Sequence, residues 1–221
     1  MHEGASCQRN LPYFSLKPID YTWIVMNLVL ASSSPTRSKI LQQLQLPFTI
    51  CSPDINESPL SGETTLNYVK RLALEKARAV SNQHPDSLII GSDQACSLNG
   101  LILGKPASSE AAVKHLKMCS GNWVEFQTGL ALINTRTHRE HVTHDTFRVK
   151  FRNLSTEEIL AYIELDKPLD CAGCFRLEAA GISLFESLEG KDYNTLLGLP
   201  MITLVTLLKE EGLNPLLAAA P

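Results

Sequence analysis

The sequence lacks a marked excess of charge of either sign. Its 221 residues include 20 Lys and Arg and 23 Asp and Glu, so the formal net charge is −3. Proteins that bind duplex nucleic acid usually carry a basic surface, because they must neutralise phosphates. The composition therefore argues against a stable nucleic-acid partner and favours a small ligand.

Closely spaced cysteines are also scarce. Among six cysteines, only Cys171 and Cys174 are near neighbours, with no second pair and no pair of histidines beside them. That is a poor basis for a zinc site, and the pair does not open a helix after a strand as a thioredoxin-like pair does. We interpret it as two neighbouring buried thiols. The scattered cysteines predict a reducing compartment, the cytoplasm.

Long apolar runs are absent. No stretch reaches the ~20 residues that cross a bilayer, and the short run around Met26 follows Asp20 rather than the basic tract of a signal peptide. We therefore expect no membrane partner. The strand and helix pattern begins at Met26, so residues 1–25 are interpreted as an N-terminal extension, for which a start-site artefact is one explanation. Residues 26–221 are expected to form a single domain.

Apolar patterns of two periods alternate along this domain. Short or alternating apolar runs predict strands at residues 28–30, 48–52, 88–90, 122–134, 141–151 and 181–187. Helical spacing predicts helices at residues 36–46, 64–80, 108–121, 156–165 and 201–212. The mixture predicts a mixed α/β fold around a curved sheet.

A serine loop, residues 32–34, ends the first predicted strand. Ser34 can cap the following helix and Pro35 suits its first position, which leaves backbone N–H groups free to face outward. Arg37 then lies in the first turn, where the helix dipole disfavours a cation. An anion bound at this terminus would remove the conflict. A solvated surface arginine explains the position equally well.

Lys76 lies on an apolar helical stripe with Leu72 and Ala73. Its ammonium group must either reach solvent along the helix surface or meet an acid, and the first is the commoner arrangement. Arg71 and Glu75 on the same helix have the spacing of a solvated ion pair. The stripe predicts a core-facing helix, with the partner of Lys76 left open.

Asp93 follows the apolar run 88–90, at what we predict to be the end of a strand. Ligands of open α/β sheets bind at the carboxyl ends of strands, although many such aspartates only form turns. Asn99-Gly100 predicts a two-residue hairpin that brings Lys105 back toward Asp93. A carboxylate with a nearby lysine suits metal-assisted phosphoryl chemistry.

Two further features admit structural interpretations. Four histidines lack a partner cluster, and solvated side chains explain them better than metal ligands do: His115, His138, His141 and His144. Residues 190–200, GKDYNTLLGLP, predict a tight loop in which Asn194 caps a helix, a lid over bound phosphates, or both.

Five segments in this order resemble the Maf family of nucleoside triphosphate pyrophosphatases: LVLASSSPTRSKIL, LIIGSDQ, GKP, TGLALIN and GKDYNTLLGLP. The likeness runs from about Asn27 to the C-terminus, and the combination is specific although each segment alone is weak. The GSDQ sequence resembles the branch that hydrolyses 7-methyl-GTP, whereas the other large branch prefers dTTP and UTP. The resemblance implies an elongated, ITPase-like mixed α/β fold with a cleft between two lobes, a divalent cation such as Mg²⁺ or Mn²⁺, and often a homodimer.

The resemblance also implies roles for particular residues. Asp93 corresponds to the proposed general base that activates water. Polar cleft positions that contact phosphate or substrate fall on Ser32, Arg37, Glu57, Lys76 and Lys105. Positions associated with base selection fall on Thr36, Gln94 and Glu178. Glu57 and Asp93 are the acidic candidates for metal ligands, and an Asp93-bound metal could itself activate the water.

Departures from the family bear on the base rather than on the phosphates. Relatives of this branch often carry an aromatic residue where this chain has Thr36, and Cys174 and Arg176 replace an expected serine and lysine. The prediction is a cytoplasmic enzyme that converts 7-methyl-GTP into 7-methyl-GMP and pyrophosphate and removes modified nucleotides from the pool. The alternatives are a dTTP/UTP pyrophosphatase, disfavoured by Gln94, and a non-catalytic nucleotide-binding regulator of cell division.

Overall fold

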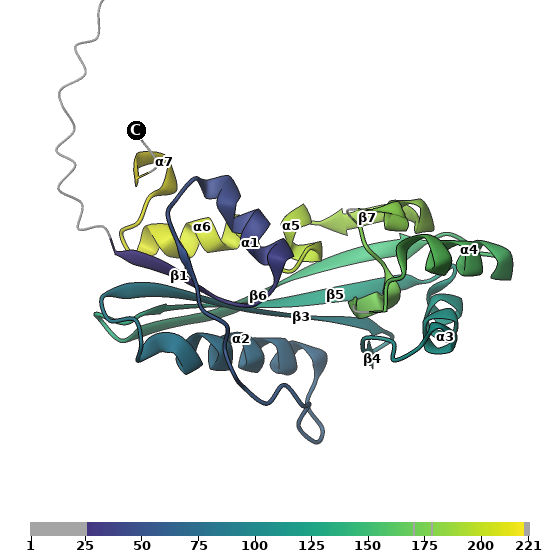
Figure 1. Ribbon diagram of the computed structural model, residues 1–221, viewed down its shortest axis with the longest axis horizontal. Helices are drawn as coiled ribbons and strands as arrows, with labels where there is room; N and C mark the ends of the chain where they lie inside the picture. The colour runs from purple at the N-terminus through teal and green to yellow at the C-terminus, as the bar shows by residue number, and fades with distance from the viewer. Residues whose placement is uncertain (1–25, 170, 178, 219–221) are drawn as a thin grey trace, which may run out of the picture.

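A mixed sheet runs along the long axis of the molecule (Figure 1). The computed structural model describes residues 26–169, 171–177 and 179–218, and over these residues the sheet has seven strands in the order β2-β1-β3-β5-β6-β7, with β4 paired to β3. The strands are β1 (Asn27–Ala31), β2 (Thr49–Ile50), β3 (Ser87–Leu98), β4 (Leu101–Leu103), β5 (Trp123–Asn134), β6 (Arg139–Phe151) and β7 (Phe185–Gly190). The mixed α/β class predicted from the sequence is confirmed.

Helices cover both faces of this sheet. They are α1 (Pro35–Leu41), α2 (Thr65–Ser81), α3 (Ser109–Cys119), α4 (Thr156–Asp166), α5 (Tyr193–Leu196), α6 (Met201–Glu210) and α7 (Pro215–Ala218). Three short 3₁₀ segments join them: η1 (Gln42–Leu44), η2 (Ala172–Cys174) and η3 (Ala180–Leu184). In Figure 1, α2 lies below the sheet and α1 and α6 lie above it.

The strand β3 is longer than the sequence pattern predicts. Its parallel pairing with β1 ends where Ala31 meets Gly91, but its antiparallel pairing with β5 continues from Leu88 to Ser97. The prediction that the strand ends before Asp93 is therefore wrong, because β5 supplies partners that the apolar run does not reveal. Asp93 instead lies in mid-strand, just beyond the point where β1 leaves the sheet.

Two glycines let α2 lie directly against the sheet. A Cβ atom at Gly91 would overlap the carbonyl oxygen of Ala73, and one at Gly129 would overlap that of Val69. Only glycine permits so close a backbone approach. This contact sets the short distance between α2 and β3 and thereby brings Lys76 to Asp93.

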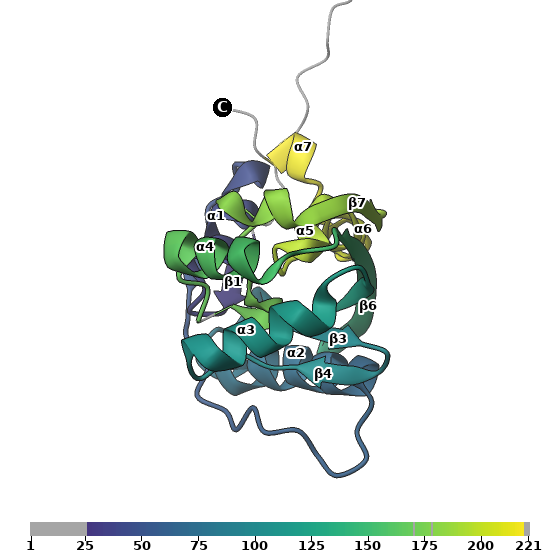
Figure 2. The same cartoon turned by 90° about the vertical axis from the view of Figure 1, so that its right-hand side faces the viewer.

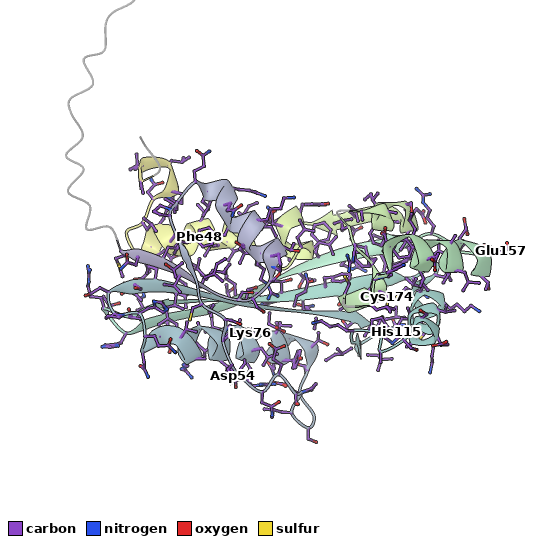
Figure 3. All side chains as sticks on the ribbon, viewed as in Figure 1. Phe48, Asp54, Lys76, His115, Glu157 and Cys174 are labelled. Atoms are coloured by element: carbon purple, nitrogen blue, oxygen red, sulfur yellow. The ribbon has the colours of Figure 1, made fainter. Side chains whose placement is uncertain are left out.

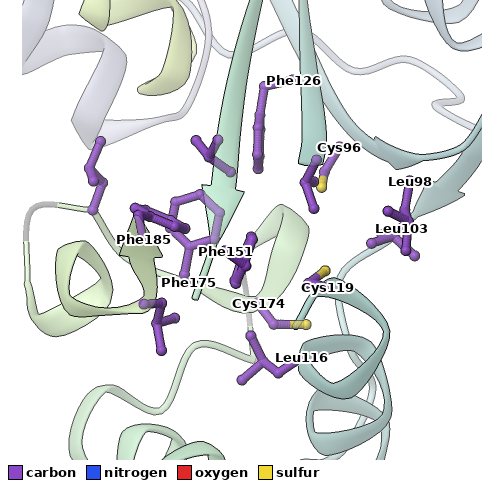
Figure 4. Close-up of a cluster of buried hydrophobic side chains, with 14 of the residues drawn as sticks. Cys96, Leu98, Leu103, Leu116, Cys119, Phe126, Phe151, Cys174, Phe175 and Phe185 are labelled. Carbon is purple, nitrogen blue, oxygen red and sulfur yellow. The ribbon is translucent and has the colours of Figure 1, made fainter. Parts of the chain in front are cut away.

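The hydrophobic core has two parts along the sheet. At one end, aliphatic residues of β1, β3 and β5 pack against α2 on one face and α6 on the other. At the other end, α3 and α4 come together (Figure 2) over a cluster of edge-to-face aromatic rings. Figure 4 shows these rings beside three buried cysteines, and the labelled residues include Phe126, Phe151, Phe175, Phe185, Cys96, Cys119 and Cys174.

Two interpretations of minor residues need correction. Cys174 is buried and burial raises the pKa of its thiol to about 12, but Cys171 is only partly buried. The imidazole of His115 lies 3.2 Å from the Cys174 sulfur, and that of His141 lies 2.6 Å from a carboxylate oxygen of Glu211. These two histidines are partly buried and have partners, because tertiary packing brings together residues that are distant in sequence.

No helix among the described residues is long and apolar enough to cross a membrane. The N-terminal extension, residues 1–25, lies outside the described residues.

Candidate functional site

A cleft of about 690 Å³ opens between the two parts of the core. Its walls come from the serine loop, the loop after β2, α2, β3, the end of the β3–β4 hairpin, and the segment that follows α5. Eight of the predicted site residues line it: Ser32, Thr36, Arg37, Glu57, Lys76, Asp93, Gln94 and Lys105. The ninth, Glu178, lies outside the described residues.

A buried lysine joins two carboxylates at the centre of this cleft. The Nζ atom of Lys76 lies 2.6 Å from Oδ1 of Asp93 and 2.8 Å from Oε1 of Glu57. The side chains of Lys76 and Asp93 are 7% and 9% exposed, whereas that of Glu57 is 55% exposed. Figure 3 labels Lys76 near the middle of the long axis. Of the two alternatives for this lysine, the structure shows the one in which it meets acids.

The environment of Asp93 makes it a better base than an ordinary aspartate. Burial raises the pKa of Asp93, and Glu57 adds to the rise, while Lys76 and Arg37 oppose it without cancelling it. A raised pKa brings a carboxylate closer to the pH at which proton transfer from water is most effective. Oδ1 is occupied by Lys76, and Oδ2 makes no hydrogen bond with any described residue.

The serine loop and α1 direct Arg37 into the cleft. Ser34 caps α1 by accepting a hydrogen bond from the Arg37 amide at 3.3 Å, and Pro35 occupies the first helical turn. The Arg37 Nε atom donates to the Gly198 carbonyl at 2.7 Å. Burial lowers the pKa of Arg37, and Asp93 and Glu57 raise it in part. Arg37 is therefore a cleft residue rather than a solvated surface arginine, and its Nη atoms make no hydrogen bond within the described residues.

Side chains of β3 and β5 bind carbonyl oxygens of α5 and of the segment that directly follows it. Ser92 Oγ lies 2.9 Å from the Gly198 carbonyl oxygen, and Gln94 Nε2 donates to the Thr195 carbonyl at 2.7 Å. Thr128 Oγ1 donates to the same Thr195 carbonyl at 2.8 Å. Since side chains alternate along a strand, Ser92 and Gln94 face this segment while Asp93 faces α2.

Asp192, not Asn194, caps the helix in this segment. Its carboxylate accepts from the amide of Asn194 at 2.8 Å, at the start of α5, and from the amide of Ile202 at 2.8 Å, at the start of α6. A carboxylate has two acceptor oxygens and can serve two helix starts at once, which an Asn194 cap at one start would not. The prediction of a tight capped loop was right in kind and wrong in its capping residue.

Lys105 reaches the cleft through the predicted hairpin. Asn99 and Gly100 both have positive φ, of 50° and 81°, as a two-residue turn of this kind requires. Leu103 pairs with Cys96, so the chain returns beside β3 and Lys105 lies in the cleft wall. Its side chain is exposed and forms no ion pair with any described residue, including Asp93.

Sequence reasoning missed several residues of the site. Tyr68 and Cys171 line the cleft, and Ser92 and Gly198 hold Arg37 in place. Tyr68 stands two helical turns before Lys76, and that spacing on one helix was an available signal. The positions of the others depend on contacts that no local pattern shows.

The donor atoms of the cleft suit a hard divalent cation. Glu57 and Asp93 each use one carboxylate oxygen on Lys76, and the second oxygen of each makes no hydrogen bond within the described residues. Among the described residues, no three or more His, Cys, Asp or Glu side chains are grouped so that they alone could hold a metal ion. Mg²⁺ commonly takes one or two carboxylates and completes its shell with water and substrate phosphates. The two free oxygens fit that mode of binding.

Comparisons with known proteins identify the family of the chain. The Maf-like protein family model matches residues 27–211. Proteins named 7-methyl-GTP pyrophosphatase are 49% identical in Pseudomonas aeruginosa, over 85% of this chain and 98% of that protein, and 51% identical in Vibrio cholerae, over 85% and 96%.

Solved structures give a more distant likeness. The Staphylococcus aureus Ham1 protein aligns with 84% of this chain and 99% of its own, at 15% identity and a TM-score of 0.48. A HAM1 protein from Coxiella burnetii aligns with 59% of this chain and 75% of its own, at 18% identity and a TM-score of 0.42. On the match of the family model and the identity to its relatives, the chain belongs to the Maf family, as its motifs predicted.

Proposed function

We propose that the protein hydrolyses 7-methyl-GTP to 7-methyl-GMP and pyrophosphate. The observation that carries the proposal is the convergence of Asp93, Lys76, Glu57 and Arg37 in one cleft. The names of the relatives in Pseudomonas aeruginosa and Vibrio cholerae support the choice of substrate. Removal of modified nucleotides from the cellular pool would follow from this activity, and the cytoplasm remains the predicted compartment.

In the proposed reaction, water attacks the α-phosphorus. Asp93 accepts a proton from the water, the new bond forms between the water oxygen and the α-phosphorus, and the bond to the bridging oxygen of the β-phosphate breaks. Pyrophosphate departs with that electron pair and the monophosphate remains. The raised pKa of Asp93 and its free Oδ2 atom support its role as the base.

Two cations and the serine loop are proposed to stabilise the phosphates. The free Nη atoms of Arg37, the exposed ammonium of Lys105 and the serine loop at Ser32 border the same cleft. Negative charge builds on the departing pyrophosphate, so groups already oriented toward it lower the barrier. Lys76 stands between the two carboxylates and would also keep Asp93 in its charged, proton-accepting form.

Glu57 would hold the divalent cation with its free carboxylate oxygen. If Oδ2 of Asp93 were a second ligand, the bound metal rather than Asp93 would activate the water. When bound, Mg²⁺ or Mn²⁺ would neutralise phosphate charge and orient the leaving group. Through their shared contact with Lys76 Nζ, Oδ1 of Asp93 and Oε1 of Glu57 lie at most about 5.4 Å apart.

Gln94 is the described residue that offers a fixed acceptor to the base in this proposal. Its Nε2 atom is held by the carbonyls of Thr195 and Leu196, so Oε1 remains as an acceptor with no hydrogen bond to a described residue. A fixed acceptor selects for a donor on the base, such as the N–H groups of guanine. The roles of Thr36 and Glu178 in base selection remain predictions, as does a homodimer.

The test is pyrophosphate release from 7-methyl-GTP, GTP, dTTP, UTP and CTP with Mg²⁺ or Mn²⁺. We expect the highest kcat/KM on 7-methyl-GTP, and loss of activity in an Asp93→Asn variant that still unfolds cooperatively on heating. Preference for dTTP or UTP would keep the chemistry and overturn the base assignment. Tight nucleotide binding without hydrolysis of any of the five would favour the non-catalytic regulator instead.

A further inference from the structure

Glu57 is held by a segment that has no regular secondary structure. Residues 51–64 connect β2 to α2 without a helix or strand, and most of their side chains are exposed. The Glu57 side chain itself is 55% exposed, yet its carboxylate lies 2.8 Å from buried Lys76. An ion pair with an exposed partner contributes little free energy, so this contact alone would not hold the segment in place.

Two side chains of α2 reach out to this segment. Tyr68 Oη donates to the Glu57 carbonyl oxygen at 3.0 Å, and Arg71 Nη2 donates to the Ser58 carbonyl oxygen at 3.2 Å. The Arg71 guanidinium lies 5.6 Å from the centre of the Tyr68 ring. Both residues thus bind the backbone at and next to the residue whose side chain enters the cleft.

Arg71 also closes the far side of the segment. Its Nε and Nη2 atoms bind both carboxylate oxygens of Glu63, at 2.7 and 2.8 Å, and Glu63 in turn accepts from the Leu60 amide at 3.0 Å. The Glu63 side chain is 7% exposed, and the hydrogen bond from Arg71 lowers the pKa of Glu63 to about 2. The pair remains charged at neutral pH and is bidentate, the strongest geometry for such a contact.

We infer that Tyr68 and Arg71 are positioning residues that clamp residues 57–63 onto α2 and thereby fix the Glu57 carboxylate in the cleft. The clamp and Lys76 stand on one helix, so the distance between the segment and the lysine is set by rigid helical geometry. The inference rests on the proposed role of Glu57 toward the divalent cation. It adds two residues whose effect passes through Glu57 rather than through contact with the reacting atoms.

The first test measures hydrogen exchange of the Ser58, Leu60 and Glu63 amides, which are hydrogen-bonded in the clamped segment, in Arg71→Lys and Tyr68→Phe. Lysine keeps the charge but cannot bind Glu63 and Ser58 together, and phenylalanine loses only the hydroxyl. The matched control is Arg78→Lys. Arg78 also lies on α2, and it makes an equally short bidentate pair, at 2.8 and 2.6 Å, with Glu140 of β6, away from the segment. We expect exchange to be about tenfold faster than in the wild type in each clamp variant, and unchanged in the control.

The second test asks whether the clamp acts through Glu57. Direct Mn²⁺ binding to the nucleotide-free protein should weaken about tenfold in Arg71→Lys, and the Mn²⁺ concentration for half-maximal activity should rise equally. The kcat at saturating Mn²⁺ should stay within about twofold, because Asp93 and the cations are untouched. In a Glu57→Gln background, adding Arg71→Lys should have little further effect on Mn²⁺ binding.

Three results would overturn the inference. They are exchange rates in both clamp variants equal to those of Arg78→Lys, unchanged Mn²⁺ binding despite faster exchange, and additive effects of Arg71→Lys and Glu57→Gln. Exchange and Mn²⁺ binding do not need turnover. A wild-type protein that hydrolyses no nucleotide would therefore refute the proposed function while these two measurements still decide on the clamp.

Discussion

Removal of the Lys76 charge is the sharpest perturbation of the cleft. In Lys76→Met the side-chain volume is nearly kept, but Asp93 loses a buried cation at 2.6 Å and Glu57 loses one at 2.8 Å. Breaking a buried ion pair from one side costs about 3–5 kcal/mol, whereas an exposed pair is worth about 0–1 kcal/mol. Because Glu57 is half exposed, most of the loss comes from Asp93, and we expect unfolding free energy to fall by about 3 kcal/mol at pH 8.

The loss should depend on pH with a definite sign. Without Lys76 the pKa of Asp93 rises further, since burial remains and the cation 2.6 Å away is gone. A folded-state pKa above the unfolded one means that the folded protein binds the proton more tightly. The destabilisation is therefore complete above that pKa and shrinks as pH falls through it. The acid limb of the kcat/KM profile should move to higher pH for the same reason.

Urea unfolding at pH 8 and pH 5 measures the effect, with Lys70→Met as the control. Lys70 lies on the same helix and makes no ion pair with any described residue. Two outcomes would refute the account of a desolvated Lys76–Asp93 pair. One is a loss of unfolding free energy in Lys76→Met no larger than that in Lys70→Met, and the other is a larger loss that is the same at pH 8 and at pH 5. An acid limb that does not move would separately refute Asp93 as the base.

Three further predictions concern positions around the cleft. Gly129→Ala should lower unfolding free energy by about 1–3 kcal/mol in urea, because a Cβ would overlap the α2 backbone; wild-type stability would contradict the close approach. Gly198→Ala should raise the substrate KM, because φ of +97° strains alanine and its Cβ would lie 3.3 Å from Arg37 Nε; an unchanged KM would show that Arg37 does not depend on this residue. Burial raises the pKa of Glu211, but hydrogen bonds from His141 and other partners lower it by more, so that the net shift is downward. The stabilisation that Glu211 provides should be complete above the pKa of an unfolded carboxyl group and should be lost as pH falls through the lower folded pKa. Unfolding of the wild type and of Glu211→Gln measures it, and a stability difference that did not shrink at low pH would contradict this prediction.

Local patterns predicted most of the fold because they depend on neighbours in sequence. The helical stripe around Leu72 and Ala73 became α2, and Asn99-Gly100 formed the expected turn with two positive φ angles. The length of β3 was not predictable in this way, since its polar half is held by pairing with β5 residues at least 28 positions later in the chain. Similarly, the partner of His141 comes from Glu211, far along the chain.

The candidate site divides along the same line. The sequence by itself determined which chemical groups were available, the serine loop, Arg37, Lys76 and Asp93, because each broke a local rule of charge or polarity. Only the tertiary structure decided that Lys76 meets two acids rather than solvent, that Asp192 caps two helices, and that Tyr68 and Arg71 hold the Glu57 segment. Propensity acts through covalent neighbours, whereas the pairing of buried charges depends on distances that exist only after α2 has packed on the sheet.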